Sequence, residues 1–210
     1  MTDKKTYRTW TDTTDFVTAA MLNEQIRDNG NATWVGTNGG DIDFYSSGST
    51  KQAIAIGTSG QVLESSGSQP YWGSYEGCKT YLNGSQSIAD STNTEITSLD
   101  TEYFDTNNFH STTSGSIIIP TGMTGLYVIG ALGYFGGNAT ANKLRHIEVA
   151  VNSGSICGEG TTNGNSDLMY ISTQTIHILN AGDKVTLKVK QTSGGALSFF
   201  NPTLWIARLK

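Results

Sequence analysis

The C-terminal part of the chain alternates apolar and polar residues with the two-residue period of a β-strand. In the segment KVTLKVKQ at 184–191, Val185, Leu187 and Val189 fall on one face, and lysine and threonine side chains fall on the other. The segment HIEVAV at 146–151 alternates in the same way. Both segments predict strands that bury one face, so we expect Val185, Leu187 and Val189 in a core.

Turn signals divide residues 78–210 into many short segments. Clusters of Gly, Pro, Asn and Asp, such as 120–122 and 181–183, separate the apolar runs. Short strands at this spacing favour a sandwich or a jelly roll, so we expect one all-β domain over 78–210. The expected strands are 78–82, 94–99, 115–119, 125–135, 144–151, 167–179, 184–191 and 204–209.

Residues 36–77 form a Gly/Ser-rich connector that is interrupted by apolar islands. A flexible linker rarely carries as many aromatic residues as this segment does. Each island is too short to make a stable sheet alone, so we expect several chains to wrap together and share a core here. This segment is therefore interpreted as a β-rich neck. The islands are 41–45, 53–57, 61–63 and 70–73.

Residues 1–35 differ from the rest, because the stretch DFVTAAMLNEQIRDN at 15–29 predicts one short helix. A helix of this length is not stable alone in water, so it must pack on something. Packing on its own domain is one possibility. Docking on a neighbouring protein is favoured, because no other helical segment follows to receive it. The apolar anchors of this arm are expected to be Trp10, Phe16, Leu22, Ile26 and Trp34.

Composition and charge argue against several classes of partner. The net charge is -5, the pI is near 5.1, and the 13 Lys and Arg residues are scattered. Nucleic-acid binding usually requires a basic surface, so nucleic acid is not an expected partner. No run approaches the length of a membrane span, and the N-terminus lacks the apolar region of a signal peptide. We therefore expect that the protein does not associate with a membrane. We also expect that it is synthesised in a reducing cytoplasm.

Two cysteines, Cys78 and Cys157, lie far apart in the sequence. They are too few for a disulfide-stapled mini-domain, and a zinc site needs about four ligands at tighter spacing. The two thiols either form one bridge or remain reduced in the core, and the second interpretation is favoured.

No catalytic motif is recognisable in the sequence. His110, His146 and His177 are isolated, although the last two lie on expected strands that could meet in a sheet. Asp100 and Asp105 lie beside turns, where acidic residues are common. We therefore expect no enzymatic activity, no cofactor and no metal site.

The order of residues in the C-terminal domain resembles the C1q/TNF family. In EYFDTNNFHSTTSGSIIIPTGMTGLYVIGAL the matching positions are Tyr103, Asp105, Phe109, Gly115, Pro120, Gly125 and Tyr127. The segment LNAGDKVTLKV at 179–189 is similar to a second family signature. The resemblance implies a ten-strand jelly roll that assembles as a homotrimer. Its expected core residues are Tyr127, Leu179, Val185, Leu187 and Val189. The resemblance also implies recognition through loops and outer faces rather than catalysis.

The front of the chain resembles virion proteins of tailed phages. The stretch TWTDTTDFVTAAMLNEQIRDN at 9–29 is similar to the opening of many such proteins, and 53–73 is similar to a recurrent fibre element. The matching positions of that element are Ile56, Gly57, Gly60, Gln61, Val62, Leu63 and Trp72.

Together these resemblances imply a homotrimeric protein of the virion surface. Residues 1–35 would attach it to a capsid or tail protein, with the head projecting outward. Capsid decoration is slightly favoured over a short tail fibre, because host-reaching fibres are commonly longer. Exposed aromatic and Asn side chains of the head loops are the candidates for contact with a host-surface glycan or receptor. The alternatives are a secreted bacterial C1q-like adhesin and, less favoured, a glycan-degrading enzyme.

Overall fold

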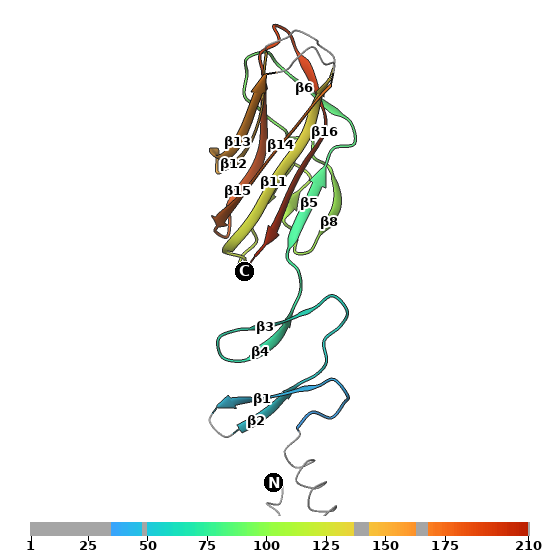
Figure 1. Cartoon of the computed structure of the whole chain (residues 1–210), viewed down its shortest axis with the longest axis vertical. Helices are drawn as coiled ribbons and strands as arrows, with labels where there is room; N and C mark the ends of the chain where they lie inside the picture. The colour runs from blue at the N-terminus through green and yellow to red at the C-terminus, as the bar shows by residue number, and fades with distance from the viewer. Residues whose placement is uncertain (1–34, 48–49, 137–142, 163–167, 210) are drawn as a thin grey trace, which may run out of the picture. The chain divides into compact units, whose positions relative to one another are not determined.

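The computed structural model describes residues 35–47, 50–136, 143–162 and 168–209. The chain divides into two compact units, with the boundary between Ser74 and Tyr75. Within the described residues all regular structure is β-strand, and the helix expected over 15–29 lies outside them. The first unit contains two antiparallel hairpins (Figure 1). Their strands are β1 (Ile42–Ser47), β2 (Thr50–Ile54), β3 (Val62–Ser65) and β4 (Pro70–Gly73).

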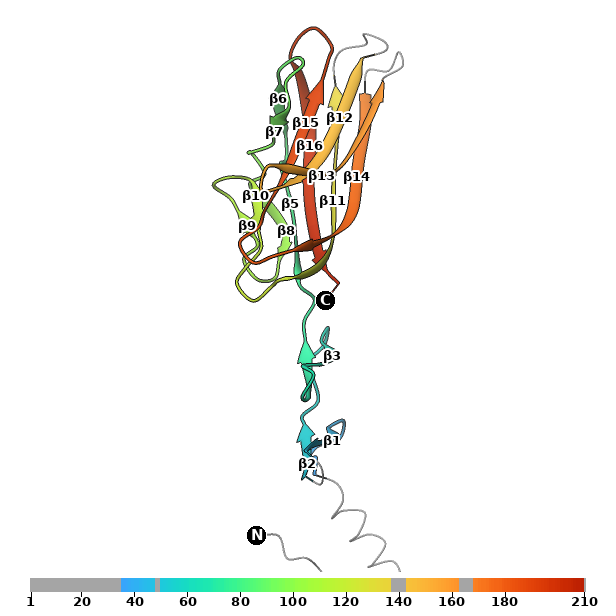
Figure 2. The ribbon, with the colours of Figure 1, turned by 90° about the vertical axis from the view of Figure 1, so that its left-hand side faces the viewer.

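The second unit is a sandwich of two antiparallel sheets (Figure 2). One sheet, here the β11 sheet, has the order β14-β11-β16-β5-β8, with β6 also paired to β16. The other, the β12 sheet, has the order β13-β12-β15-β10-β9, with β7 also paired to β15. The strands are β5 (Gly77–Tyr81), β6 (Ser85–Ile88), β7 (Thr94–Glu95), β8 (Thr101–Asp105), β9 (His110–Ser111), β10 (Ser116–Ile118), β11 (Gly125–Gly136), β12 (Leu144–Val151), β13 (Gly154–Thr162), β14 (Leu168–Leu179), β15 (Lys184–Gln191) and β16 (Leu197–Arg208).

The hydrophobic core lies between these two sheets, and all of its fully buried members come from the second unit. Each of the five residues expected in the head core is fully buried in the structure. The ring of Tyr127 meets Phe109 edge-on at 6.3 Å, and its hydroxyl donates a hydrogen bond to the Met123 carbonyl. The five residues are Tyr127, Leu179, Val185, Leu187 and Val189.

Strands with clean alternation have the expected bounds, whereas others differ for local reasons. The segment expected as a strand over 94–99 is a strand only at Thr94–Glu95. Beyond it, the left-handed Gly115 (φ 59°) lies so close to Thr97 that a Cβ would come 2.6 Å from the Thr97 carbonyl oxygen. This contact holds residues 97–99 in a loop that covers the core, where Leu99 is fully buried.

The last strand begins at Leu197 instead of residue 204. Pro202 has no backbone N–H to donate to the neighbouring strand. A bulge opposite Leu132–Tyr134 allows β16 to continue past this proline. Asn201 adopts a left-handed conformation at this bulge (φ 46°).

The β13 strand was not expected, because its segment is rich in glycine. Gly158 and Gly160 lie beneath the ring of His146 on the neighbouring strand, and a Cβ at Gly158 would come 3.0 Å from His146 Nε2. The glycines therefore provide room for a side chain within a sheet rather than marking a loop.

Candidate interaction surface

The histidines do not form a site. His146 lies on β12 and His177 on β14, which belong to different sheets, so the two residues do not meet within one sheet. No group of three or more His, Cys, Asp or Glu side chains able to hold a metal occurs among the described residues. No helix long and apolar enough to cross a membrane occurs in the part of the chain that the structure describes.

His110 and Asp105 hold loops in place. The Nδ1 atom of His110 lies 2.8 Å from the Glu102 carboxylate, and its Nε2 atom lies 3.0 Å from the Leu99 carbonyl oxygen. The Asp105 carboxylate accepts hydrogen bonds from the backbone N–H groups of Phe109 (2.9 Å) and His110 (2.8 Å). These contacts pin the 105–110 turn, so Asp105 has a structural role in this turn.

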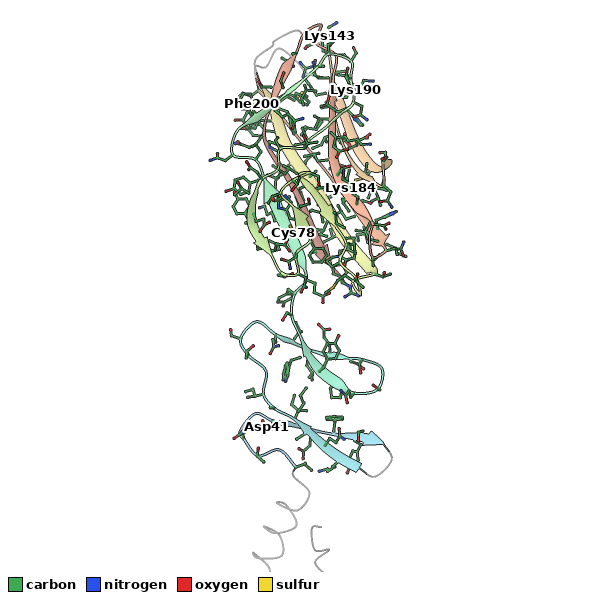
Figure 3. All side chains as sticks on the ribbon, turned by 180° about the vertical axis from the view of Figure 1, so that it is seen from behind. Asp41, Cys78, Lys143, Lys184, Lys190 and Phe200 are labelled. Carbon is green, nitrogen blue, oxygen red and sulfur yellow. The ribbon has the colours of Figure 1, made fainter. Side chains whose placement is uncertain are left out.

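Both cysteines are free thiols, as the favoured interpretation of the sequence had it. Cys78 is buried within the β11 sheet (Figure 3). Cys157 is half-buried on β13 of the other sheet. Burial raises the pKa of the Cys78 thiol to about 12, and the negative charges of Asp105 and Glu102 act in the same direction. This thiol is therefore protonated and unreactive at neutral pH.

The five expected anchors, Trp10, Phe16, Leu22, Ile26 and Trp34, lie outside the described residues. An extended surface with the chemistry of an interface occurs among the described residues of the head.

That surface is the outward side of the β11 sheet, and β14 contributes its most exposed members. Facing outward from β14, Tyr170 is 73% exposed, Ile176 is 60% exposed and Ile178 is 63% exposed. Ser172 and Gln174 face outward at the centre of this strand, so its outward apolar residues lie toward its two ends.

Strand β11 extends this surface across the sheet. Leu126 pairs with Ile178 and Leu132 is also exposed, while the alternate residues of the strand point into the core. Gly130 lies beneath the indole ring of Trp205 on β16, and a Cβ at Gly130 would come 1.9 Å from that ring. The glycine therefore lets the indole lie flat on the sheet.

Aromatic rings continue the surface toward one end of the head. The ring of Tyr134 is stacked on Phe200 with 5.2 Å between centroids and 12° between planes, and it also contacts Tyr170 at 4.8 Å. Phe200 lies toward the end of the head away from Cys78 (Figure 3). We name this surface the apolar face, and its members are Leu126, Leu132, Tyr134, Leu168, Tyr170, Ile176, Ile178, Phe200 and Trp205.

A second, smaller cluster lies at the opposite edge of the same sheet, on β5 and β8. Tyr103 is 64% exposed, its ring lies 4.4 Å from that of Tyr81, and Phe104 is 48% exposed beside them. The ammonium of Lys79 lies 4.5 Å from the centroid of the Tyr103 ring, a cation–π distance. We name Tyr81, Tyr103 and Phe104 the tyrosine edge.

The outward positions of β14, β11 and β16 carry no charged side chain. A solvent-facing antiparallel sheet normally places polar residues outward, and a large exposed apolar patch marks a contact surface. The chemistry of the apolar face therefore suits burial against another protein surface.

The apolar face is not among the surfaces expected from the sequence. The signal was present, because β11 and β14 carry apolar residues in both phases of the alternation. Such strands are covered on both sides. Which set of alternating residues points out of the sandwich is determined by the pairing of β11 with β14 and β16. The sequence pattern alone therefore does not identify the outward apolar residues.

No protein-family model matches the sequence, and no curated protein matches it. Among solved structures, the chain is similar to vertex protein P5 of PRD1, with a TM-score of 0.52 at 15% identity over 64% of this chain and 97% of that one. It is also similar to the globular domain of zebrafish complement 1qA protein (TM-score 0.46, 14% identity, 64% and 96% covered). A third match is Eiger TNF from S. frugiperda (TM-score 0.45, 11% identity, 65% and 93% covered). The two-sheet topology and the similarity to P5 confirm the all-β jelly-roll sandwich expected for the head.

Proposed function

We propose that this chain is a non-enzymatic, homotrimeric structural protein of a phage virion surface. Residues 1–35 attach it to a capsid or tail protein, and the jelly-roll head projects from the particle. The observation that carries self-association is the apolar face, a broad and uncharged surface on a domain that already has a complete core.

The arrangement of the two exposed clusters supports a ring of chains. The aliphatic part of the apolar face lies along β14, at one edge of the β11 sheet, and the tyrosine edge lies on β8 at the other. Two different patches on one molecule suit a head-to-tail contact, in which the first patch of one chain meets the second patch of the next. A head-to-tail contact that closes after three copies gives a trimer without free patches.

The virion location is supported by the sequence of the arm and by one structural likeness. The segments 9–29 and 53–73 resemble tailed-phage virion proteins. A vertex protein of the phage PRD1 shares the fold of the head. Capsid decoration is preferred to a short tail fibre, because the proposed arm is brief. Three linked arms raise the effective concentration of each, so weak docking becomes lasting attachment.

Immunogold electron microscopy of purified particles tests this proposal, with antibody raised against the whole chain. Label over the capsid supports decoration, and label confined to the tail supports a fibre. Particles that carry no label contradict a virion role. The arm is tested by adding the Leu22→Asp/Ile26→Asp variant to particles that lack the protein. We expect it to remain unbound while the wild-type chain binds, and equal binding of both would contradict the assigned anchor.

A further inference from the structure

The two hairpins of the first unit have related sequences. Residues 35–49 read VGTNGGDIDFYSSGS, and residues 56–68 read IGTSGQVLESSGS. Both begin with a β-branched aliphatic residue followed by Gly-Thr, and both end with Ser-Ser-Gly-Ser. The first is longer, and the structure accounts for part of the difference by a bulge between Tyr45 and Ser47 on β1. The segments are therefore two copies of one motif.

The same hydrogen bonds close the loop that leads into each hairpin. In the first, the backbone N–H of Asn38 donates to the Asp41 carboxylate (2.9 Å), and the N–H of Thr37 donates to the same oxygen (2.8 Å). In the second, the backbone N–H of Thr58 donates to the side-chain oxygen of Gln61 (2.7 Å). Each acceptor side chain belongs to the residue immediately before the first strand of its hairpin.

The backbone around these two acceptors is also the same. The N–H of Asp41 donates to the Asn38 carbonyl at 3.2 Å, and the N–H of Gln61 donates to the Thr58 carbonyl at 3.2 Å. A glycine with positive φ precedes each of them, with φ 97° at Gly40 and φ 86° at Gly60. A side chain would strain this left-handed backbone, so both copies need glycine there. The equivalence of the copies thus extends from sequence to geometry.

Each copy is linked to its neighbour in the chain by a further contact. The N–H of Ile56, at the start of the second copy, donates to the Asp41 carboxylate at 3.2 Å. The indole N–H of Trp72 donates to the Ala55 carbonyl at 2.7 Å, and its ring covers Gly57. The copies are therefore joined as a tandem array.

Neither copy has a core of its own. The core cluster of the described residues contains no member from the first unit. Large apolar side chains remain exposed in both copies instead, and an isolated two-stranded hairpin is marginally stable at best. These side chains are Val35, Tyr45, Ile56, Val62, Leu63 and Tyr71.

We propose that residues 35–74 are a tandem repeat of one trimerisation module, in which each hairpin packs its exposed apolar residues against the same hairpin of two other copies of this chain. A partner with the same repeat spacing matches both hairpins at once, and another copy of this chain has that spacing. The inference rests on the homotrimer proposed above. Because each neck is directly continuous with a head, association of the heads would hold the necks at high effective concentration.

Spin labels at equivalent positions of the two modules test this inference. Asn38→Cys and Ser59→Cys place a label in the same exposed loop of each module, and Thr121→Cys places a control label in an exposed turn of the head. The labels go into a full-length Cys157→Ser background, where the remaining Cys78 thiol is buried. Interspin distances are then measured by double electron–electron resonance.

If both hairpins trimerise, the interspin distance distribution should be narrow at residue 38 and at residue 59. It should also be narrow at residue 121 in the head. Leu63→Asp should broaden the distribution at residue 59, whereas Gln69→Asp, at an exposed polar position of the same hairpin, should not. Narrow distances at 121 with broad ones at 38 and 59 would overturn the module and leave the trimeric head intact. A narrow distance distribution at only one of residues 38 and 59 would contradict the proposal that the two hairpins are copies of one trimerisation module. Absence of any interspin distance at 121 would count against the homotrimer itself.

Discussion

Replacing Ile176 by serine should weaken the trimer without unfolding the head. The Ile176 side chain is 60% exposed on β14, so the single chain loses little packing when it is shortened. Complete burial of an isoleucine side chain stabilises by about 1.5–3 kcal/mol, so covering the exposed part is worth about 1–2 kcal/mol at each interface. The substitution removes this contribution three times in a trimer.

The cost of the substitution can be expressed as a shift in concentration. A loss of about 4 kcal/mol per trimer lowers the formation constant by about a thousandfold, since about 1.4 kcal/mol corresponds to tenfold. Because three chains associate, the concentration of half-dissociation depends on the square root of that constant. The midpoint should therefore rise by about 30-fold.

Sedimentation velocity over a concentration series measures this shift, and the structure offers a matched control. Ile118 is also exposed, at 41%, but it lies on β10 of the other sheet. Ile118→Ser should leave the midpoint where it is in the wild-type protein. The reasoning would be refuted if Ile176→Ser dissociated at the wild-type concentration, or if Ile118→Ser shifted the midpoint equally.

Three further results are expected. At pH 8 a thiol reagent should modify Cys157 and leave Cys78 unmodified until the protein is denatured, because burial raises the pKa of Cys78 to about 12; rapid modification of Cys78 in the native state would contradict its placement. Gly130→Val should displace the Trp205 indole, shifting tryptophan fluorescence and weakening the trimer, whereas an unchanged emission spectrum would contradict the contact. The N–H of Asn180 lowers the pKa of the Asp183 carboxyl, so this carboxylate stabilises the fold above its unfolded pKa of about 3.9 and loses that effect as pH falls through the lower folded value. The stability gap between wild type and Asp183→Asn should therefore narrow below about pH 4 in denaturant titrations, and a gap that widens there would contradict the assignment.

Part of the head could be predicted from the sequence, because some strands, such as β15, bury one clean apolar phase. Val185, Leu187 and Val189 alternate with polar residues, and β15 has the expected bounds. Local signals misled where tertiary contacts determine conformation. Gly158 lies outside the strands expected from the sequence, yet it belongs to β13, where its lack of a side chain makes room for His146.

The candidate surface could not be predicted in the same way. In β14, both phases of the alternation contain apolar residues, so the pattern alone does not say which of Ile176 and Leu179 faces the core. Pairing with β11 decides the question, and it comes from residues distant in sequence. The repeat over 35–68 is visible in the sequence, but the shared role of Asp41 and Gln61 required the hydrogen bonds.

The measurement that tests the central claim most directly is the mass of the intact assembly by native mass spectrometry. The apolar face and the tyrosine edge predict a species of three times the 22.4 kDa chain mass, with no larger open-ended series. A protein that remains a monomer at micromolar concentration would contradict the account, because the exposed apolar face would then have no partner among its own copies.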